Sequence, residues 1–417
     1  MITGRRRVAV TGLGVVTCLG SDVEQFWQAL LKGESGVRRI NTFDTSDLPC
    51  QIAGQIQDFD PGDFIPVKQA RRMSRVSKLS LVAAHKAVTD SKLPLPLENP
   101  ERVGVYFGTA IGGLERADEG LQQMRSTGWS HVNPFIIPSA LPNMPAFHVT
   151  LHYGAYGPNC TYTTACATGT QAVGEAAHAI RYGKADAVIA GGAEGMIQRY
   201  TVAGFANMRA LPTSYNDDPE RASRPFDAKR EGFVFSEGAA FLVLESLEHA
   251  RERNAKIYAE LAGYACSNDA YHVAAPDPTA AGATRTMDWA IQDAGILPEQ
   301  ISYINAHGTS TPANDAMETK AIKKLFGEHA YRLPISSTKS MIGHAMGGSG
   351  AIEAVVCALS IDRGKIHGTL NYEYPDPELD LDYVTDGMRE LNHLDSALSN
   401  SFGLGGQNAC IVLRRID

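Results

Sequence analysis

The stretch GTQAVGEAAHAIRYGK at residues 169–184 has a counterpart in GAIEAVVCALSIDRGK at residues 350–365. Each stretch places an apolar, helix-type run between two glycines and ends in a lysine. The distance between the two far exceeds the repeat length of about 20–50 residues that solenoid proteins use. Two interpretations are open at this point. The chain contains either a duplicated α/β half or two buried helices that resemble each other by chance.

Short β-type runs alternate with helix-type segments on both sides of these stretches. Several of the β-type runs are almost wholly apolar, which is typical of strands buried on both faces. The alternation predicts an α/β protein with a mainly parallel sheet. We expect strands at Arg7–Val16, Val103–Gly108, Ala187–Gly191, Ala239–Glu245, Ile257–Gly263, Ile301–Asn305 and Cys410–Leu413, and helices at Leu79–Asp90, Thr168–Tyr182, Ala283–Ala294, Asp315–Phe326 and Ala351–Arg363.

A charged stretch, ESLEHARERNAK at residues 245–256, lies between the two glycine-bounded helices. No proline- or serine-rich linker accompanies it, so the parts on either side are expected to pack together. We therefore predict an N-terminal half at 1–254 and a C-terminal half at 255–417. The segment 214–229 is rich in Asn, Asp, Pro and Arg and is predicted to be a long loop.

Composition excludes several classes of protein. The 417 residues carry a formal net charge of −8, which argues against nucleic-acid binding. The seven cysteines are scattered and form no CxxC pair, so neither a disulfide framework nor a zinc site is indicated, and a reducing, cytoplasmic location is expected. The apolar run after Arg7 is interrupted by Gly and Thr and is better interpreted as a buried strand than as a signal peptide. No run reaches the roughly 20 apolar residues of a membrane-spanning helix.

A candidate nucleophile lies directly before the first of the two helices. In YTTACATG at 162–169, a β-prone run leads into Cys166, and small residues then open the helix. Unpaired N–H groups and the dipole at a helix N-terminus favour a thiolate, and the same N–H groups can bind a developing oxyanion. The alternative is a buried, inert cysteine, which is the usual role of a free cysteine.

Two histidines occupy similar positions. In INAHGTSTP at 304–312, His307 follows a predicted strand, where α/β sheets place their sites. In PISSTKSMIGHAMGGSG at 334–350, His344 comes just before the second helix, nearly where Cys166 stands relative to the first. A single histidine is more often structural than catalytic. Two of them, each at a strand-to-helix junction beside glycines and hydroxyls, favour a catalytic pair.

The motifs taken together resemble a known family, the β-ketoacyl–acyl-carrier-protein synthases, and within it the type II subgroup. The resemblance runs in order through nearly the whole chain. It rests on TGLGVVTCLG at 11–20, TACATG at 164–169, SRPFDAKREGFVFSEGA at 223–239, NAHGTSTPAND at 305–315, SSTKSMIGH at 336–344 and NSFGLGG at 400–406. It implies an α/β chain with a duplicated thiolase-like fold in five layers, αβαβα, and a homodimer.

The resemblance also implies roles for single residues. Cys166 would carry the acyl group, and His307 and His344 would stabilise an enolate. Lys339 and Glu318 would form a supporting ion pair. The remaining expectations concern substrate: Thr309 and Thr311 bind the phosphopantetheine arm, Ile111 and Phe205 line the acyl pocket, and Phe402 is the gating residue whose N–H, with that of Cys166, forms the oxyanion hole. The chain departs from the family pattern at Leu404, commonly Phe, and Gln407, more often Thr, which puts its chain-length preference in doubt.

The implied reaction is a decarboxylative Claisen condensation in fatty-acid elongation, giving 3-oxoacyl–acyl-carrier protein. A type II polyketide or polyene route is the alternative pathway. The enzyme would bind no cofactor and no metal, because the phosphopantetheine arm comes with the acyl-carrier protein. An acidic carrier protein could dock on the basic residues Lys68, Arg71, Arg72 and Arg209. The alternative for these four is an ordinary solvated basic face.

Other chemistries with related residues are less well supported. A thiolase would carry a second cysteine in the C-terminal glycine loop, where this chain has Phe402. A type III ketosynthase pairs its cysteine with one histidine and an asparagine. A Cys–His hydrolase would release free acid without consuming malonyl groups. A non-catalytic chain-length partner would lack the nucleophile, which is present here.

Overall fold

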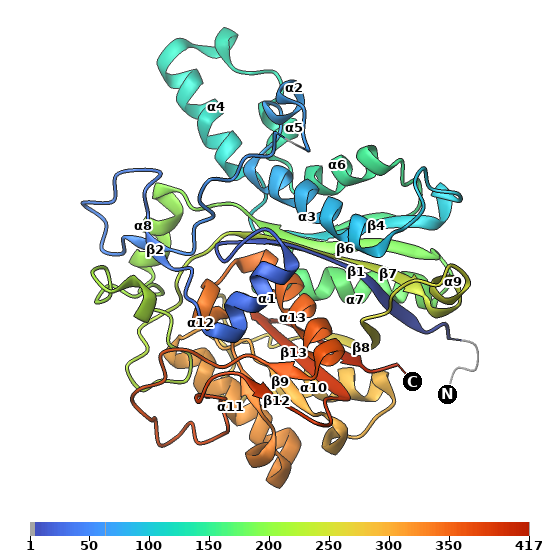
Figure 1. Ribbon diagram of the computed structural model, residues 1–417. Helices are drawn as coiled ribbons and strands as arrows, with labels where there is room; N and C mark the ends of the chain where they lie inside the picture. The colour runs from blue at the N-terminus through green and yellow to red at the C-terminus, as the bar shows by residue number, and fades with distance from the viewer. Residues whose placement is uncertain (1–4, 63, 417) are drawn as a thin grey trace.

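The computed structural model describes residues 5–62 and 64–416, and its centre is a ten-stranded sheet (Figure 1). The strand order is β10-β9-β13-β14-β8-β1-β7-β6-β4-β5. The strands are β1 (Val8–Thr17), β4 (Val103–Gly108), β5 (Asn159–Tyr162), β6 (Ala187–Glu194), β7 (Gly238–Ser246), β8 (Ala259–Asn268), β9 (Tyr303–Asn305), β10 (Ile335–Ser336), β13 (Ser396–Gly403) and β14 (Gln407–Arg414). Two short pairs, β2 (Arg38–Arg39) with β3 (Ile52–Ala53) and β11 (Lys365–Ile366) with β12 (Arg389–Glu390), lie outside it.

The sheet repeats one arrangement twice. Read inward from each end, β5-β4-β6-β7-β1 matches β10-β9-β13-β14-β8, with the same parallel and antiparallel pairings at each step. The two sets meet at β1 and β8, which pair only through Ala9 with Glu260 and Val10 with Ala259. Of the two interpretations that the sequence left open, the duplicated half is therefore confirmed.

The prediction of a mainly parallel sheet is wrong. Parallel pairing is confined to β4–β5, β4–β6, β9–β10 and β9–β13, and every other neighbouring pair is antiparallel. Helices cover both faces of the central strands, so antiparallel strands such as β7 are also wholly buried, and β7 is apolar from Ala239 to Leu244. An apolar run reports burial on both faces and does not report strand direction.

Helices complete five layers in the order αβαβα (Figure 1). α3 (Arg75–Ser91) and α6 (Met144–Tyr153) cover the outer face of the first set of strands, and α10 (Ala281–Ala294) and α11 (Pro312–Phe326) cover that of the second. α7 (Thr168–Arg181) and α13 (Ser349–Arg363) lie between the two sets and share one apolar core. The thiolase-like architecture that the resemblance implied is confirmed.

The two central helices touch at their N-termini through backbone. A Cβ atom on Gly169 would lie 2.7 Å from the backbone nitrogen of Ala351 and from the carbonyl oxygen of Gly347. A Cβ atom on Gly350 would lie 2.6 Å from the backbone nitrogen of Thr170. Glycine at both positions is what permits this contact. It brings the residues just before the two helices to one place.

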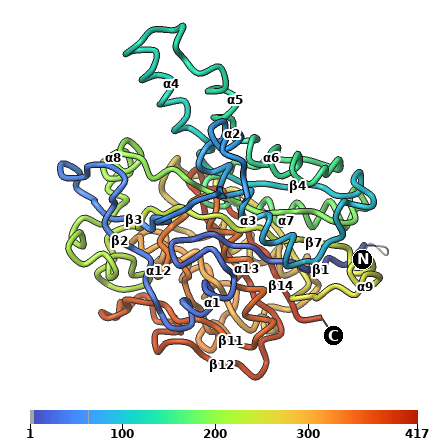
Figure 2. The backbone as a smooth tube through the Cα atoms, turned by 45° about the horizontal axis from the view of Figure 1, so that its top comes forward, coloured from blue at the N-terminus to red at the C-terminus, as the bar shows by residue number. Residues whose placement is uncertain are grey.

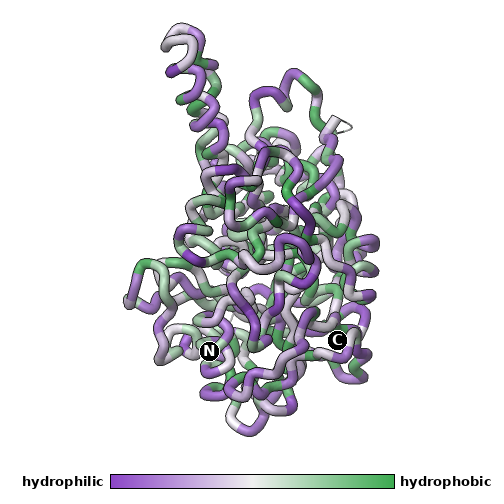
Figure 3. The backbone as a smooth tube through the Cα atoms, turned by 90° about the vertical axis from the view of Figure 1, so that its left-hand side faces the viewer, coloured by the Kyte–Doolittle hydropathy of each residue, from purple (hydrophilic) through white to green (hydrophobic). Residues whose placement is uncertain are grey.

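The other helices lie around these layers. They are α1 (Val23–Lys32), α2 (Val67–Ala70), α4 (Leu114–Thr127), α5 (Ile136–Ala140), α8 (Arg199–Asn207), α9 (Leu247–Glu252) and α12 (Lys339–Ile342). α4 and α5 project from the layered body (Figure 2), and hydrophilic and hydrophobic residues are mixed along the projection (Figure 3). Among the described residues, no helix combines the length and apolar character needed to span a bilayer.

Candidate active site

Cys166 lies in a 3₁₀ turn, Ala165–Ala167, between the end of β5 and the start of α7. The predicted strand-to-helix junction is therefore confirmed. The preceding Ala165 has a φ of 50°, a left-handed conformation that an alanine adopts only under constraint from its surroundings. The thiol is buried beneath the glycine-rich segment after β13, since a Cβ atom on Gly403 would lie 3.0 Å from the backbone nitrogen of Cys166.

The two histidines approach this thiol from the second half of the chain. His307 follows β9, and His344 lies between α12 and α13. Their ring centroids are 5.4 Å apart with the planes nearly perpendicular, at 85°. One sulfur and one nitrogen from each ring all lie within 4.8 Å of one another. The convergence of these three side chains, which is the central prediction from the sequence, is confirmed.

The three groups line a cavity of about 400 Å³ that opens at the surface. Of the other residues predicted for substrate, Thr309, Thr311, Phe205 and Phe402 line it as well, and Arg209 lies at its rim. Ile111 is not among the residues that line this cavity but packs in the same apolar cluster as Cys166 and Phe205. Larger hollows of about 860 and 800 Å³ contain none of the three reactive groups.

Burial sets the protonation of the site. It raises the pKa of the Cys166 thiol to about 11, although the ammonium of Lys339 and the N–H of Leu404 act in the opposite direction. Burial, followed by the charge of Lys339, holds the pKa of His307 and of His344 well below the ordinary value. The expected thiolate is therefore wrong for the free protein, because loss of water outweighs the stabilisation available at the helix end. Near neutral pH the site holds a thiol and two uncharged imidazoles.

This protonation state predicts the pH dependence of alkylation. Because the thiolate is the reactive species and the pKa of Cys166 is raised to about 11, the rate of alkylation by iodoacetamide should rise about tenfold per pH unit from pH 7 to 10, without a plateau. Peptide-resolved mass spectrometry separates Cys166 from the exposed Cys266. A plateau for Cys166 near neutral pH would contradict the buried thiol.

Lys339 pairs with a residue that the sequence did not indicate. Its ammonium forms a buried ion pair with Glu353 of α13. Glu318 instead accepts hydrogen bonds from the backbone N–H groups of His307 and Gly308, each at 2.8 Å, and from Asn400 Nδ2 at 3.0 Å. The expected Lys339–Glu318 ion pair is therefore wrong, because both oxygens of Glu318 already hold the backbone beneath His307. Glu353 lies within a helix predicted as apolar, and nothing in its spacing marked it as a partner.

The backbone N–H groups of Leu404 and of Cys166 itself act on the sulfur and lower the pKa of the thiol, against the effect of burial. Phe402 lies with its ring 5.8 Å from that of His307 and its carbonyl next to the imidazole. The oxyanion hole expected from the N–H groups of Phe402 and Cys166 stays a prediction, because an N–H that acts on the sulfur does not thereby face the oxygen of a bound thioester.

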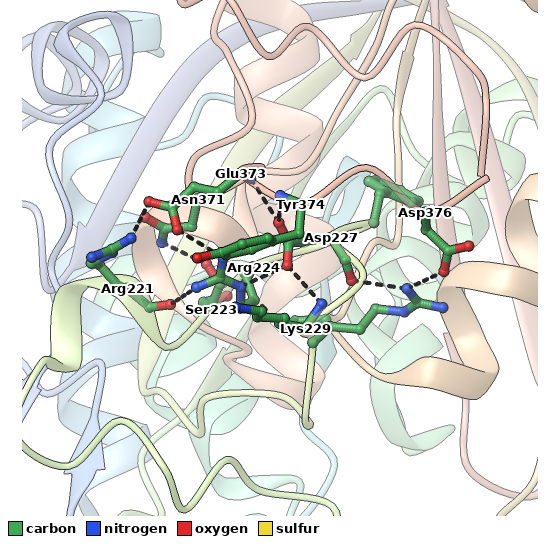
Figure 4. A network of polar contacts seen from close by, with 12 residues as sticks. Arg221, Ser223, Arg224, Asp227, Lys229, Asn371, Glu373, Tyr374 and Asp376 are labelled. Atoms are coloured by element: carbon green, nitrogen blue, oxygen red, sulfur yellow. Dashed lines mark hydrogen bonds and ion pairs between the residues drawn. The ribbon is translucent and has the colours of Figure 1, made fainter. Parts of the chain in front are cut away.

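A polar network fixes the segment that carries the two threonines (Figure 4). Asp227, in the predicted loop, accepts from the N–H groups of Glu373 and Tyr374, both at 2.7 Å, and from Arg224 Nε at 3.0 Å. The N–H of Arg224 in turn donates to Ser310 Oγ at 3.0 Å, directly between Thr309 and Thr311. The hydroxyls of the two threonines are 2.9 Å apart and face the cavity. Their position is therefore built into the fold.

The predicted basic residues are exposed. Lys68 lies in α2, Arg71 and Arg72 follow it directly, and Arg209 follows α8. The guanidinium of Arg72 lies over the ring of Phe135, 4.2 Å from its centroid. In the described part of the chain, none of the four forms an ion pair, so their charges are available to an acidic partner.

Cys166, His307 and His344 are donor types that zinc uses, and their donor atoms lie within 4.8 Å of one another. The positive charge of Lys339, which acts on the thiol and on both imidazoles, disfavours a metal cation at these atoms. Asn305 Oδ1 and Glu353 Oε2 are buried oxygens without a hydrogen-bond partner among the described residues.

Comparisons with known proteins agree with this geometry. The family model "Beta-ketoacyl synthase, N-terminal domain" matches residues 5–250, and "Beta-ketoacyl synthase, C-terminal domain" matches residues 258–373. The chain is 47% identical to 3-oxoacyl-[acyl-carrier-protein] synthase 2 of Synechocystis over 99% of this chain and 98% of that protein. It is 48% identical to the protein of the same name from Coxiella burnetii, over 99% of each.

Solved structures give the same result. A β-ketoacyl synthase from Burkholderia phymatum superposes with a TM-score of 0.91 at 36% identity, covering 99% of this chain and 100% of that one. A type II polyketide ketosynthase, solved with its acyl-carrier protein and bound to the hexaketide, superposes with a TM-score of 0.90 at 35% identity and the same coverage. Fold and site together define an acyltransferase of the thiolase-like, condensing class. Within that class, the chain belongs to the β-ketoacyl synthase family.

Proposed function

We propose that this protein elongates acyl chains by condensing an acyl thioester with malonyl–acyl-carrier protein, with loss of CO2, to give 3-oxoacyl–acyl-carrier protein. The observation that carries the proposal is the meeting of Cys166, His307 and His344 at one cavity that opens to solvent. Fatty-acid elongation is favoured over a polyketide route, because identity is 45–48% to the 3-oxoacyl-[acyl-carrier-protein] synthase 2 proteins and 35% to the type II polyketide ketosynthase structure.

In the first half-reaction, the acyl group moves from the carrier's thiol to Cys166. The sulfur attacks the thioester carbonyl, the carrier's C–S bond breaks, and the proton of the Cys166 thiol ends on the departing phosphopantetheine thiol. The N–H groups of Cys166 and Phe402 would bind the oxyanion that forms on the thioester carbonyl, as the family resemblance implies. One thioester replaces another, so no additional energy source is needed.

In the second half-reaction, malonyl–carrier protein enters the same cavity. Its carboxylate leaves as CO2, and the electron pair of the broken C–C bond becomes an enolate on the thioester. The imidazoles of His307 and His344, held uncharged by burial, can each donate an N–H to the enolate oxygen. The carbon then attacks the acyl-Cys166 carbonyl. A C–C bond forms, and the cysteine sulfur leaves and regains a proton.

The phosphopantetheine arm is expected to lie along the open end of the cavity. The hydroxyls of Thr309 and Thr311 face it and are held by the network around Asp227 and Ser310. Phe205 lines the cavity, and both Phe205 and Ile111 pack in the apolar cluster that contains Cys166, where an acyl chain would extend. No bound cofactor is required, because the carrier supplies the arm.

Reconstitution with purified carrier proteins tests the proposal. Mixed acyl-carrier thioesters followed by malonyl-carrier protein should yield an acyl adduct on Cys166 and a 3-oxoacyl carrier longer by two carbons, both measured by mass spectrometry. The dominant adduct reports the preferred chain length. Release of free acid without consumption of malonyl groups would identify a hydrolase instead.

Docking of the carrier is expected on the exposed basic residues near α2. Reversing two charges, Arg71→Glu with Arg72→Glu, should raise the KM for carrier-bound substrates about tenfold or more and leave kcat for small pantetheine thioesters unchanged, because charge at such a surface mainly steers encounter. Steady-state kinetics with both substrates measure the difference.

A matched control for docking is Arg251→Glu with Arg332→Glu, which reverses two exposed cations in α9 and in the 3₁₀ segment before β10. Equal loss with carrier-bound and small substrates in the Arg71 and Arg72 variant would discard the docking role. A loss of the same size in the control variant would show a general effect of charge.

We further propose the organisation expected from the sequence, with halves at 1–254 and 255–417, a homodimer and a cytoplasmic location. Along the chain, β7 is the last strand of the first set and β8 is the first strand of the second set, which supports the boundary between the halves.

Two features support the homodimer. β5 is an edge strand, and the projecting segment around α4 and α5 exposes apolar side chains such as Trp129, 83% exposed, and Ile137, 63% exposed. Exposed edges and apolar patches of this kind favour pairing with a second copy. Seven free cysteines favour a reducing compartment.

A further inference from the structure

Ser349 is the first residue of α13, and its hydroxyl lies against the imidazole of His344. Ser349 Oγ is 2.9 Å from His344 Nδ1, and the serine is 1% exposed. The other ring nitrogen, Nε2, is buried and has no hydrogen-bond partner among the described residues. Since His344 lines the cavity, one side of the ring is held by Ser349 while the other remains available to substrate.

The duplicated half shows that this contact is specific to the second helix. Thr168 begins α7 as Ser349 begins α13. The Thr168 hydroxyl is occupied by its own backbone, donating to the carbonyl of Ala165 at 2.6 Å and accepting from the N–H of Thr164 at 2.7 Å. The Ser349 hydroxyl makes no such local bond in the described chain. The hydroxyl at the first position of the helix is therefore hydrogen-bonded to backbone groups in the first half and to the imidazole of His344 in the second half.

The direction of the Ser349–His344 hydrogen bond follows from counting donors and acceptors. An uncharged imidazole carries one proton, so Nδ1 either accepts from the serine or donates to it. If Nδ1 donates, the serine proton has no acceptor and Nε2 is left as a bare, buried acceptor. If Nδ1 accepts, the serine proton is satisfied and only the Nε2–H awaits a partner. Because an unpaired buried polar group is costly, the second arrangement is favoured.

We propose that Ser349 is a positioning residue that donates to Nδ1 of His344 and thereby keeps the proton on Nε2. The ring then presents an N–H to the cavity, as stabilisation of an enolate oxygen requires. Phe233 and His307 pack edge-on against the same ring, at centroid distances of 5.4 Å each, and fix its plane. The inference rests on the role proposed for His344 and adds to it the group that selects its tautomer.

The first test separates the two half-reactions. Ser349→Ala should slow malonyl consumption by pre-acylated enzyme about tenfold, the range expected from loss of one buried hydrogen bond and its tautomer control. Acylation of Cys166, which does not use the Nε2–H, should stay within about twofold of wild type. Ser349→Thr keeps the hydroxyl and should recover most of the loss.

The matched control is Ser360→Ala. Ser360 lies in the same helix and is equally buried, and its hydroxyl has no partner among the described residues. It should leave both half-reactions unchanged. If Ser349→Ala consumes malonyl groups at the wild-type rate, or slows both half-reactions equally, Ser349 does not position His344.

The second test needs no variant of Ser349. In protein labelled with ¹⁵N-histidine, the His344 resonances, assigned by their loss in His344→Gln, should show an unprotonated Nδ1 and a protonated Nε2 near neutral pH. The reverse tautomer would overturn the inference. Malonyl consumption at the wild-type rate by His344→Gln would instead overturn the proposed role of His344, so the two failures are distinguishable.

Discussion

Replacement of Cys166 by alanine is expected to reduce condensation about a thousandfold or more, because Cys166 is the only thiol among the described residues that line the cavity. The methyl group of alanine fits the space of the thiol, so the fold should be retained. Formation of 3-oxoacyl–carrier protein, followed by mass spectrometry, measures the loss, and the acyl adduct should be absent.

The control for this variant is Cys266→Ala, which removes an exposed thiol at the end of β8 and should leave both adduct and product at wild-type levels. Unlike Cys166, Cys266 does not line the cavity. If the Cys166 variant retained condensation, the nucleophile would be another group and the central assignment would be wrong.

The second large effect is expected at His344. His344→Ala should lower the rate of malonyl decarboxylation about 10²- to 10³-fold, the loss found when one hydrogen-bond donor to a developing oxyanion is removed. Acylation of Cys166 should persist, since the imidazole is needed only when the enolate forms. Release of CO2 from malonyl–carrier protein and the mass of the acyl-enzyme report the two steps separately.

His148→Ala is the matched control for the histidine. His148 is likewise buried, burial lowers its pKa to about 4, and its Nδ1 has no partner among the described residues, but it lies in α6 outside the cavity. This control should leave decarboxylation unchanged even if stability falls. Equal losses in the two variants would show that His344 acts through folding rather than through the enolate.

Much of the fold could be predicted from local pattern. β4 spans the predicted Val103–Gly108 from end to end, and the helices were placed correctly at their C-terminal ends, to within about one residue. Four of these helices begin about two to four residues earlier than apolar spacing indicated. In two of them a polar side chain sets the start: Ser74 caps α3 by accepting from the N–H of Ser77, and Thr311 caps α11 by accepting from that of Asn314. Strand direction was not predictable, because burial on both faces gives parallel and antiparallel strands the same pattern.

The reactive residues were predictable because their chemistry requires particular side chains beside glycines and strand ends. The residues that hydrogen-bond or pair with these reactive groups and their neighbours could not be predicted. Glu353 and Ser349 belong to a helix whose spacing indicates only burial, and their contacts with Lys339 and His344 depend on how α13 meets the loops before it. The N–H of Leu404 is a backbone group, and the side chain at that position carries no signal for it.

The close backbone approach at Gly169 and Gly350 joins the two repeats beside the place where the reactive groups meet. One repeat contributes the sulfur and the other contributes both imidazoles, so neither repeat by itself holds a complete set of reagents. Because α7 and α13 share one apolar core, a polypeptide that contained one repeat alone would lose the reaction and part of its packing together.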